Sequence, residues 1–126
     1  MILLDTCAIL WLATGGKELS PSVLRRLDDE AVVAVSAISA FEIALKTSSH
    51  KLHLPLPVWD WWRGVVDRHR LSVLAIDADT AIKATELPPL HRDSADRFII
   101  STALLNNSPV VTADRRFVGY GVTVLF

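Results

Sequence analysis

Short apolar runs and longer amphipathic segments alternate along the chain, and each change of period predicts a new element. Five runs rich in aliphatic residues predict buried strands, at residues 2–4, 32–35, 71–76, 109–112 and 122–125. Apolar residues at helical spacing predict helices at residues 6–13, from 20–21 onward, at 39–51, from 57 onward, at 79–86 and at 93–106. Apolar strands separated by helices are typical of a parallel sheet covered on both faces. The pattern therefore predicts an α/β fold, a three-layer α/β/α arrangement around a central, mostly parallel sheet of about five strands.

Capping residues mark several ends of these segments. Ser20 is typical of a helix N-cap and Pro21 of the first helical position, and the glycine pair at 15–16 indicates that the preceding helix ends there. Ser39 and Glu42 have the Ser-x-x-Glu spacing of a capping box, which predicts that Ser39 begins a helix. These signals are local, so they predict boundaries but not which helices pack together.

The composition indicates one folded domain of the cytoplasm. The chain has 126 residues, of which 51% are hydrophobic and 21% charged, so we expect a single domain over residues 1–126 with a buried core. No apolar stretch approaches the roughly 18 residues that a membrane helix needs, and the N-terminus lacks the basic start of a secretory signal. The single cysteine, Cys7, cannot form an internal disulfide, as expected for a reducing compartment. The net charge of −1 excludes a large basic surface for nucleic acid but leaves room for a small one.

Acidic residues gather at one edge of the predicted sheet. Asp5 and Asp114 directly follow the first and fourth strands. Glu42 lies in the helix after the second strand, and Asp93 and Asp96 begin the helix before the fourth. In a parallel sheet these positions project from the same edge, so the carboxylates would repel one another unless a cation neutralised them. Oxygen ligands without His or Cys suit Mg²⁺ or Mn²⁺, which can activate water and stabilise a phosphodiester under attack.

Each acid also has an ordinary structural explanation. Asp5 and Asp93 are typical helix N-caps, and Asp114 is a typical turn residue. Glu42 stands four residues before Lys46, the spacing of a helical ion pair. No single acid therefore indicates a site; only the joint pattern does.

Four segments resemble the PIN-domain ribonucleases and, within that family, the VapC-type toxins. They are LLDTCAILWL at 3–12, SAFEIALKTSSHKLHLP at 39–55, HRDSADRFIISTAL at 91–104 and VVTADRRF at 110–117. The second and third segments are the most specific, and together the four extend over nearly the whole chain. The resemblance implies a PIN-like fold with an acidic, Mg²⁺-dependent active site, in which Mn²⁺ could substitute.

The resemblance also implies roles for individual residues. Asp5 and Asp96 match the principal metal ligands. Glu42 would orient a water molecule or share a metal, and Asp114 would be the most weakly held ligand. Further polar positions of the family's site match three accessory residues: Asp93, Thr6 and Thr112. The chain departs from many relatives only at non-acidic positions: Cys7, His50 and Ser94.

The implied reaction is endonucleolytic cleavage of RNA. Water attacks phosphorus in line, so the products carry 5′-phosphate and 3′-hydroxyl ends. In VapC-type systems a small antitoxin blocks the site, often with a basic side chain among the carboxylates, and homodimers are usual. We therefore expect an RNA substrate, a cognate antitoxin and a second copy of the chain as partners.

Basic side chains beside the acids are candidates for contacts with RNA phosphates. The ordinary alternative is that they are solvated or form ion pairs with Asp93 and Asp114. Those in question are Arg92, Arg97, Arg115 and Arg116.

Aromatic residues, histidines and the cysteine carry weaker expectations. Trp59 and Trp62 fit an apolar helical stripe and are expected in the core, whereas Trp61 is expected at an exposed dimer or antitoxin contact. Cys7 is expected to be a small buried apolar side chain. The histidines show no metal-ligand spacing and are expected at the surface: His50, His53, His69 and His91.

Two other functions remain open at this stage. A DNA-directed nuclease would use the same metal chemistry, and a catalytically silent PIN domain would act as a binding module. A catalytically silent domain would be expected to have lost one or more of these acids, whereas this chain has all of them. A haloacid-dehalogenase type of phosphohydrolase is disfavoured because Cys7 stands where its second aspartate belongs.

Overall fold

The computed structural model describes residues 1–126, and a five-stranded sheet of order β3-β2-β1-β4-β5 forms its centre. All neighbouring strands run parallel. The strands are β1 (Ile2–Leu4), β2 (Val33–Ser36), β3 (Ser72–Leu74), β4 (Val110–Val111) and β5 (Val124–Leu125). The predicted parallel sheet is confirmed. Several strands are shorter than their apolar runs because pairing with a neighbour ends before the run does.

Both faces of the sheet are buried, each against its own helical layer. Successive strand residues point to opposite faces. Ile2, Leu4 and Val35 belong to one core and Leu3 and Ala34 to the other, all with no exposed surface. Burial on both faces explains why the strands are continuously apolar rather than alternating.

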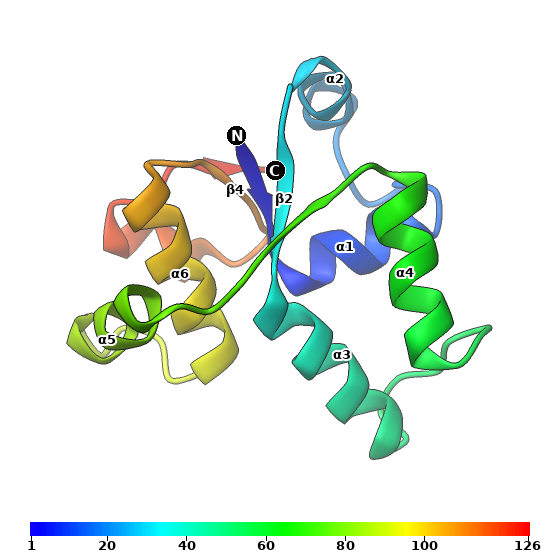
Figure 1. Cartoon of the computed structure of the whole chain (residues 1–126). Helices are drawn as coiled ribbons and strands as arrows, with labels where there is room; N and C mark the ends of the chain where they lie inside the picture. The colour runs from blue at the N-terminus through cyan, green and yellow to red at the C-terminus, as the bar shows by residue number, and fades with distance from the viewer.

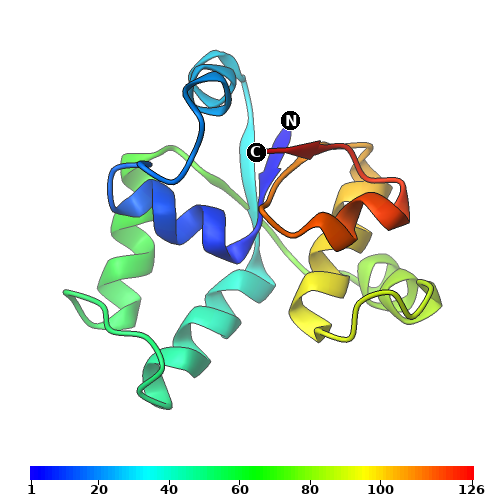
Figure 2. The ribbon, with the colours of Figure 1, turned by 180° about the vertical axis from the view of Figure 1, so that it is seen from behind.

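The helices form the two outer layers. They are α1 (Thr6–Ala13), α2 (Pro21–Asp29), α3 (Ala37–Ser48), α4 (Val58–Arg68), α5 (Ala78–Glu86), α6 (Ser94–Asn106) and the 3₁₀ helix η1 (Arg115–Tyr120). Figure 1 shows the sheet nearly edge-on between α1 and α4 on one side and α5 and α6 on the other. The view from behind, Figure 2, shows the same three layers. No helix is both long and apolar enough to cross a membrane.

The start of α3 differs from the predicted capping box. The helix begins at Ala37, and the hydroxyl of Ser36 accepts the amide N–H of Ile38 at 3.1 Å. Ser39 is instead fully buried, and its hydroxyl lies 2.9 Å from that of Thr6. The capping prediction was wrong because Ser36, the last residue of β2, offers an earlier cap. Glu42 therefore lies in the second turn of the helix.

The tryptophans of α4 also differ from the prediction. Trp61 is buried with 7% of its surface exposed, whereas Trp59 is 72% exposed and Arg63 lies over its ring. The helix begins at Val58 and directs Trp61 and Val65, four residues apart, into the core. The expectation of an exposed contact at Trp61 and a buried Trp59 was wrong, because the buried face of α4 is rotated toward Trp61 and away from Trp59. Trp62 is partly buried against the core, as expected.

Candidate active site

The candidate site lies where the order of the strands reverses. From β1 the chain crosses to β2 on one side, and later to β4 on the other, so β1 and β4 flank a switch point. Asp5 and Thr112 directly follow these two strands, with Asp114 two residues beyond Thr112. Ligands of open α/β sheets bind in the crevice beyond such strand ends.

Asp5 is a buried carboxylate whose hydrogen-bond donors are uncharged. It caps α1, and its Oδ1 accepts the amide N–H of Ala8 at 2.8 Å. Burial is the largest influence and raises the pKa of Asp5, as do the charges of Glu42 and Asp114, while bonds from Thr112 and Ala8 lower it. The ionised form of Asp5 therefore costs free energy that a cation would offset.

Asp96 has a similar environment at the start of α6. The helix is capped by Asp93, whose Oδ1 accepts the amide N–H of Asp96 at 3.1 Å. Burial of Asp96, with the nearby charges of Asp93, Asp5 and Glu42, raises its pKa to about 6, whereas His91 opposes the shift. Asp93 thus has the N-cap role that its position indicated, and its charge adds to the negative field.

Asp114 differs because an arginine neutralises it. Its Oδ1 accepts from both the amide and the Nε of Arg116, at 3.0 Å each, and its Oδ2 accepts from Arg116 Nη2 at 2.8 Å. These bonds outweigh burial and, with a bond from His91, lower the pKa of Asp114 to about 2. Arg116 therefore forms an ion pair with Asp114, which is the ordinary alternative given for the arginines in the sequence analysis.

His91 connects Asp96 and Asp114. Its Nε2 lies 2.8 Å from Asp96 Oδ2 and 2.9 Å from Asp114 Oδ2, and only 3% of the residue is exposed. The expectation that His91 lies at the surface was wrong. Metal-ligand spacing along the sequence could not identify His91, because its partners lie on α6 and at the N-cap of η1, distant in the sequence. The usable signal was its place two residues before Asp93, the cap of the helix that carries Asp96.

The structure brings the acids together to different degrees. Ligand atoms of His91, Asp96 and Asp114 all lie within 4.8 Å of one another. Asp5 and Glu42 lie close enough to raise the pKa of Asp96 through their charges, but they are outside that tight group. Glu42 is 3.4 Å from Lys46, the ion pair that its spacing indicated.

Other predicted positions have mixed outcomes. The hydroxyl of Thr112 accepts the amide N–H of Asp114 at 3.0 Å, whereas Thr6 contacts Ser39. Cys7 is exposed, so its expected burial was wrong: it occupies the outer side of the first turn of α1.

Arg97 does not face the site as a free cation. Its guanidinium donates five hydrogen bonds of 2.7–3.2 Å to the carbonyls of Ala84, Leu87, Pro88 and His91. This uses all five N–H groups of the side chain. Arg97 therefore ties the segment after α5 to α6, and its expected contact with substrate is incompatible with this arrangement.

The donor set fits a hard divalent cation. Asp5 and Asp96 are carboxylates with raised pKa values and no arginine or lysine in contact, so the site carries unneutralised negative charge. Carboxylate oxygens are the ligands that Mg²⁺ and Mn²⁺ prefer. Asp5 and Asp96 could hold such an ion, with Glu42 and Asp114 at its border.

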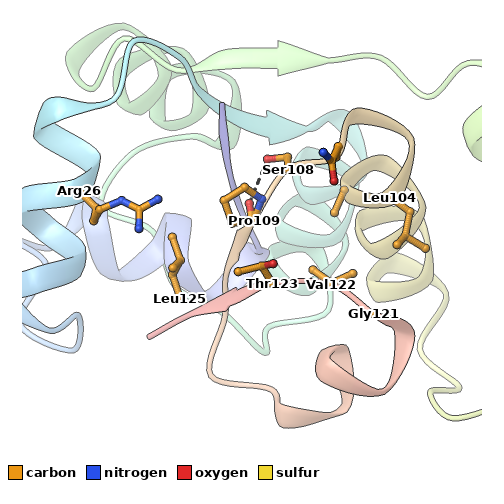
Figure 3. Close-up of a pocket in the computed structure, with 10 residues that line it drawn as sticks. Arg26, Leu104, Ser108, Pro109, Gly121, Val122, Thr123 and Leu125 are labelled. Atoms are coloured by element: carbon orange, nitrogen blue, oxygen red, sulfur yellow. Dashed lines mark hydrogen bonds between the residues drawn. The ribbon is translucent and has the colours of Figure 1, made fainter.

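A second hollow lies at the opposite edge of the sheet, before β4 and β5. It has a volume of about 370 Å³ and is lined by segments that include Ser108–Pro109 and Gly121–Thr123. In Figure 3, Arg26 is its one charged side chain, and Ser108 bonds the carbonyl of Pro109. It contains no carboxylate and lies away from the switch point, so it lacks the features that distinguish the acidic site.

Comparisons with known proteins agree with this geometry. A family model for the PIN domain matches residues 2–122. Ribonuclease VapC22 of Mycobacterium tuberculosis is 31% identical over 116 residues, which cover 91% of this chain and 88% of that protein.

Solved structures share the fold at lower identity. The chain from VapBC2 of Rickettsia felis, bound to a promoter DNA fragment, has a TM-score of 0.75 and 20% identity, with 98% of this chain and 97% of that chain covered. The chain from VapBC of Salmonella typhimurium, also bound to DNA, has a TM-score of 0.72 and 19% identity, with 98% and 95% covered. At these identities the likeness shows the fold alone.

Proposed function

The chain belongs to the PIN-domain family, and on that premise we propose that it is a metal-dependent endoribonuclease, the toxin of a type II toxin–antitoxin system. The observation that carries the proposal is a pair of carboxylates beside the switch point of the sheet, buried Asp5 and half-buried Asp96, neither of which contacts an arginine or a lysine. The similarity to a VapC ribonuclease supports RNA as the substrate.

The acidic side chains of the site would have different roles in hydrolysis. Asp5 and Asp96 would hold Mg²⁺, or Mn²⁺ in its place, while Glu42 would orient the attacking water and Asp114 would be the weaker ligand. A bound divalent ion would supply Lewis-acid stabilisation of the phosphate charge that develops during attack. The buried side chains around Asp5 and Thr112 would exclude bulk water and keep the carboxylates at fixed positions.

The proposed reaction breaks the bond between phosphorus and the 3′ oxygen. Water attacks phosphorus in line, its oxygen stays on the phosphate, and the 3′ oxygen leaves and takes up a proton. The products therefore carry 5′-phosphate and 3′-hydroxyl ends. No step uses the 2′-hydroxyl as nucleophile, which distinguishes these products from those of ribonucleases that form cyclic phosphates.

Arginines at the border of the site would contact the phosphates of RNA. Arg115 is exposed, and Arg116 is exposed over 60% of its side chain while it holds Asp114. Arg92 is exposed as well. Such contacts position a nucleic acid without reading its sequence.

An apolar groove beside the acids supports a protein partner. It has a volume of about 410 Å³, lies between α3 and α6, and includes Phe41, Leu45 and Phe98 together with Glu42 and Asp93. Phe41 is 61% and Leu45 54% exposed. We assign this groove to an antitoxin that anchors an apolar side chain there and directs a basic one toward the acids.

The further partners follow from the same premise. A structural neighbour from Klebsiella pneumoniae, solved as a toxin–antitoxin complex, supports an antitoxin as partner. We also propose a homodimer and action in the cytoplasm, where RNA and a co-produced antitoxin are both available. Copurification with a small protein that protects Phe41 from solvent would support the assignment of the groove. Self-association that buries Phe41 in the isolated toxin would assign the groove to a second copy instead.

The direct test is cleavage of total cellular RNA by purified, partner-free protein with Mg²⁺ or Mn²⁺. Asp5→Asn and Asp96→Asn are the inactive references, and Asp67→Asn, an exposed acid on α4, is the matched control. Discrete new 5′-phosphate ends that disappear with EDTA and in both references would support the proposal.

Two results would contradict it. Cleavage of DNA but not RNA under the same conditions would make the chain a DNA nuclease. Folded, metal-binding protein that cuts neither nucleic acid would make it a binding module.

A further inference from the structure

Hydrogen bonds of the backbone and an aromatic contact of the ring hold the imidazole of His91 in place. Its amide N–H donates to Tyr120 Oη at 2.7 Å, and that hydroxyl donates to Pro88 O at 2.7 Å. The carbonyl of His91 accepts from Arg97 Nη1 at 3.1 Å. The ring itself stands edge-on to Phe117, with centroids 6.2 Å apart. The backbone and the ring of this residue are thus both held.

The contacts of the two ring nitrogens establish which one carries the proton. Nδ1 accepts the amide N–H of Asp93 at 3.2 Å, so its lone pair is used there. Nε2, by contrast, faces two carboxylate oxygens, which can only accept when ionised. A neutral imidazole has one donor and one acceptor nitrogen, so the proton lies on Nε2.

We propose that His91 is a positioning residue of the active site. Its Nε2–H, hydrogen-bonded to Asp114 Oδ2 and 2.8 Å from Asp96 Oδ2, forms a bridge that holds these carboxylates, from the N-cap of η1 and from α6, at metal-binding separation. The inference rests on the proposed function, because it concerns the same acids. It adds a residue that acts through the ligands rather than as one.

The bridge meets a physical need of the site. Two ionised carboxylates that approach one another repel, and the separation would widen without a donor or cation between them. Hydrogen bonds to charged acceptors are shorter and stronger than neutral ones. The bridge uses Oδ2 of Asp96, which leaves Oδ1 of that carboxylate for an incoming ion.

The same geometry argues against His91 as a metal ligand. A histidine that binds a metal through one nitrogen almost always donates its other ring N–H to a carboxylate, carbonyl or water. Here the other nitrogen, Nδ1, faces an amide N–H and must accept. Ligation through Nε2 would therefore place two N–H groups against each other at Nδ1.

A pair of amide variants separates positioning from simple packing. The amide nitrogen of Gln can occupy the place of Nε2, whereas that of Asn reaches only to the place of Nδ1. His91→Gln therefore keeps a donor toward both carboxylates, and His91→Asn removes it while it retains polarity and the amide group.

The readout is Mn²⁺ affinity, measured by electron paramagnetic resonance on each folded variant. We expect His91→Asn to lose about 10- to 100-fold in affinity, the usual cost of removing a hydrogen-bond partner of a metal ligand, and His91→Gln to recover most of it. Equal affinity for wild type and His91→Asn would overturn the inference. Equal losses in both variants would also overturn it, since a packing role alone would explain them.

A measurement on the unaltered protein covers the case in which a variant fails to fold. The ¹⁵N shifts of the His91 ring in metal-free protein report which nitrogen is protonated. Protonated Nε2 supports the bridge, and a proton on Nδ1 alone overturns it. The proposed function fails differently: wild-type protein would then bind no Mn²⁺ or leave RNA intact, whatever the state of His91.

Discussion

Asp96 and Asp114 are both reached by the same histidine nitrogen, yet their pKa values move in opposite directions. Burial and neighbouring acids raise the pKa of Asp96 to about 6. Arg116 lowers that of Asp114 to about 2. The shared neighbour His91 thus does not decide the pKa of either carboxylate; the arginine beside Asp114 and its absence beside Asp96 do.

The contrast extends to the regions in which these residues lie. The inner region contains Asp5, directly after β1, and Asp96, at the start of α6. Neither acid contacts an arginine or a lysine, and His91 is the basic residue beside Asp96. The outer region, at η1, already has its negative charge neutralised by Arg116. The inner region is therefore where an added cation would relieve most repulsion, and it is the half of the site in which we propose that the metal binds.

The largest expected effect is on catalysis. Asp5→Asn and Asp96→Asn should each reduce the rate of RNA cleavage by about 1000-fold, because loss of a metal ligand removes several kcal/mol of transition-state stabilisation. Asp114→Asn should cost less, about 10- to 100-fold, because its charge is already paired. Single-turnover rates of RNA cleavage at saturating Mg²⁺ measure these losses. A larger loss for Asp114→Asn than for Asp96→Asn would show that the two regions do not differ in this way.

The pH dependence of metal binding follows from the same difference. Below about pH 6 Asp96 is mostly protonated, so an ion must displace a proton, and Mn²⁺ affinity should fall about tenfold per pH unit. Asp114 stays ionised down to about pH 2 and should contribute nothing to this slope. Calorimetric titrations between pH 5 and 8 would measure the slope. A flat profile in wild type, or an unchanged slope in Asp96→Asn, would contradict the account.

The stability of the metal-free protein should change with opposite sign in the two regions. The raised pKa of Asp96 means that its ionised form opposes folding above the pKa of the unfolded chain. Asp96→Asn should therefore raise the free energy of unfolding at neutral pH by about 1 kcal/mol, or roughly 4 °C in Tm. The lowered pKa of Asp114 means that its ionised form favours folding, an effect lost as pH falls toward 2, so Asp114→Asn should lower Tm. Thermal scans with EDTA would show both, and shifts of the same sign would count against the assignment.

The smallest effect concerns the two exposed arginines of η1. Arg116→Ala should raise the pKa of Asp114 toward its ordinary value and strengthen Mn²⁺ binding about threefold, since a nearby positive charge is removed. Arg115→Ala is the matched control, because the Arg115 side chain forms no ion pair or hydrogen bond with Asp114, and this variant should leave Mn²⁺ affinity unchanged. Both should weaken RNA binding about threefold through lost phosphate contacts. Isothermal titration with Mn²⁺ distinguishes the two variants, and equal metal affinities would show that Arg116 does not govern the outer acid.

Much of the fold was predictable because its signals are local or periodic. The strand runs gave all five strands, and Ser20 caps α2 as predicted, with its hydroxyl accepting the amide N–H of Val23. The capping box at Ser39 failed because Ser36, outside the pattern, competes as the cap. Trp59 and Trp61 lie about 200° apart around the helix, at opposite margins of the apolar stripe, so a small rotation of the buried face buries Trp61 and exposes Trp59.

The site was predictable as a set of acids but not as a set of contacts. Strand ends place Asp5 and Asp114 at one edge, which follows from parallel topology alone. The bridge through His91 and the use of Arg97 on backbone carbonyls depend on the path of residues 87–93, where no period operates. The identity of the atoms that neutralise each carboxylate therefore needs three-dimensional coordinates.

The most direct test of the central claim is the position of Mn²⁺ in a crystal of the wild-type protein, located by its anomalous scattering. We predict a peak in the inner region, at a ligand distance of about 2.1–2.3 Å from carboxylate oxygens of both Asp5 and Asp96. A peak bound only through Asp114, with Arg116 displaced and Asp5 without contact to the ion, would contradict it.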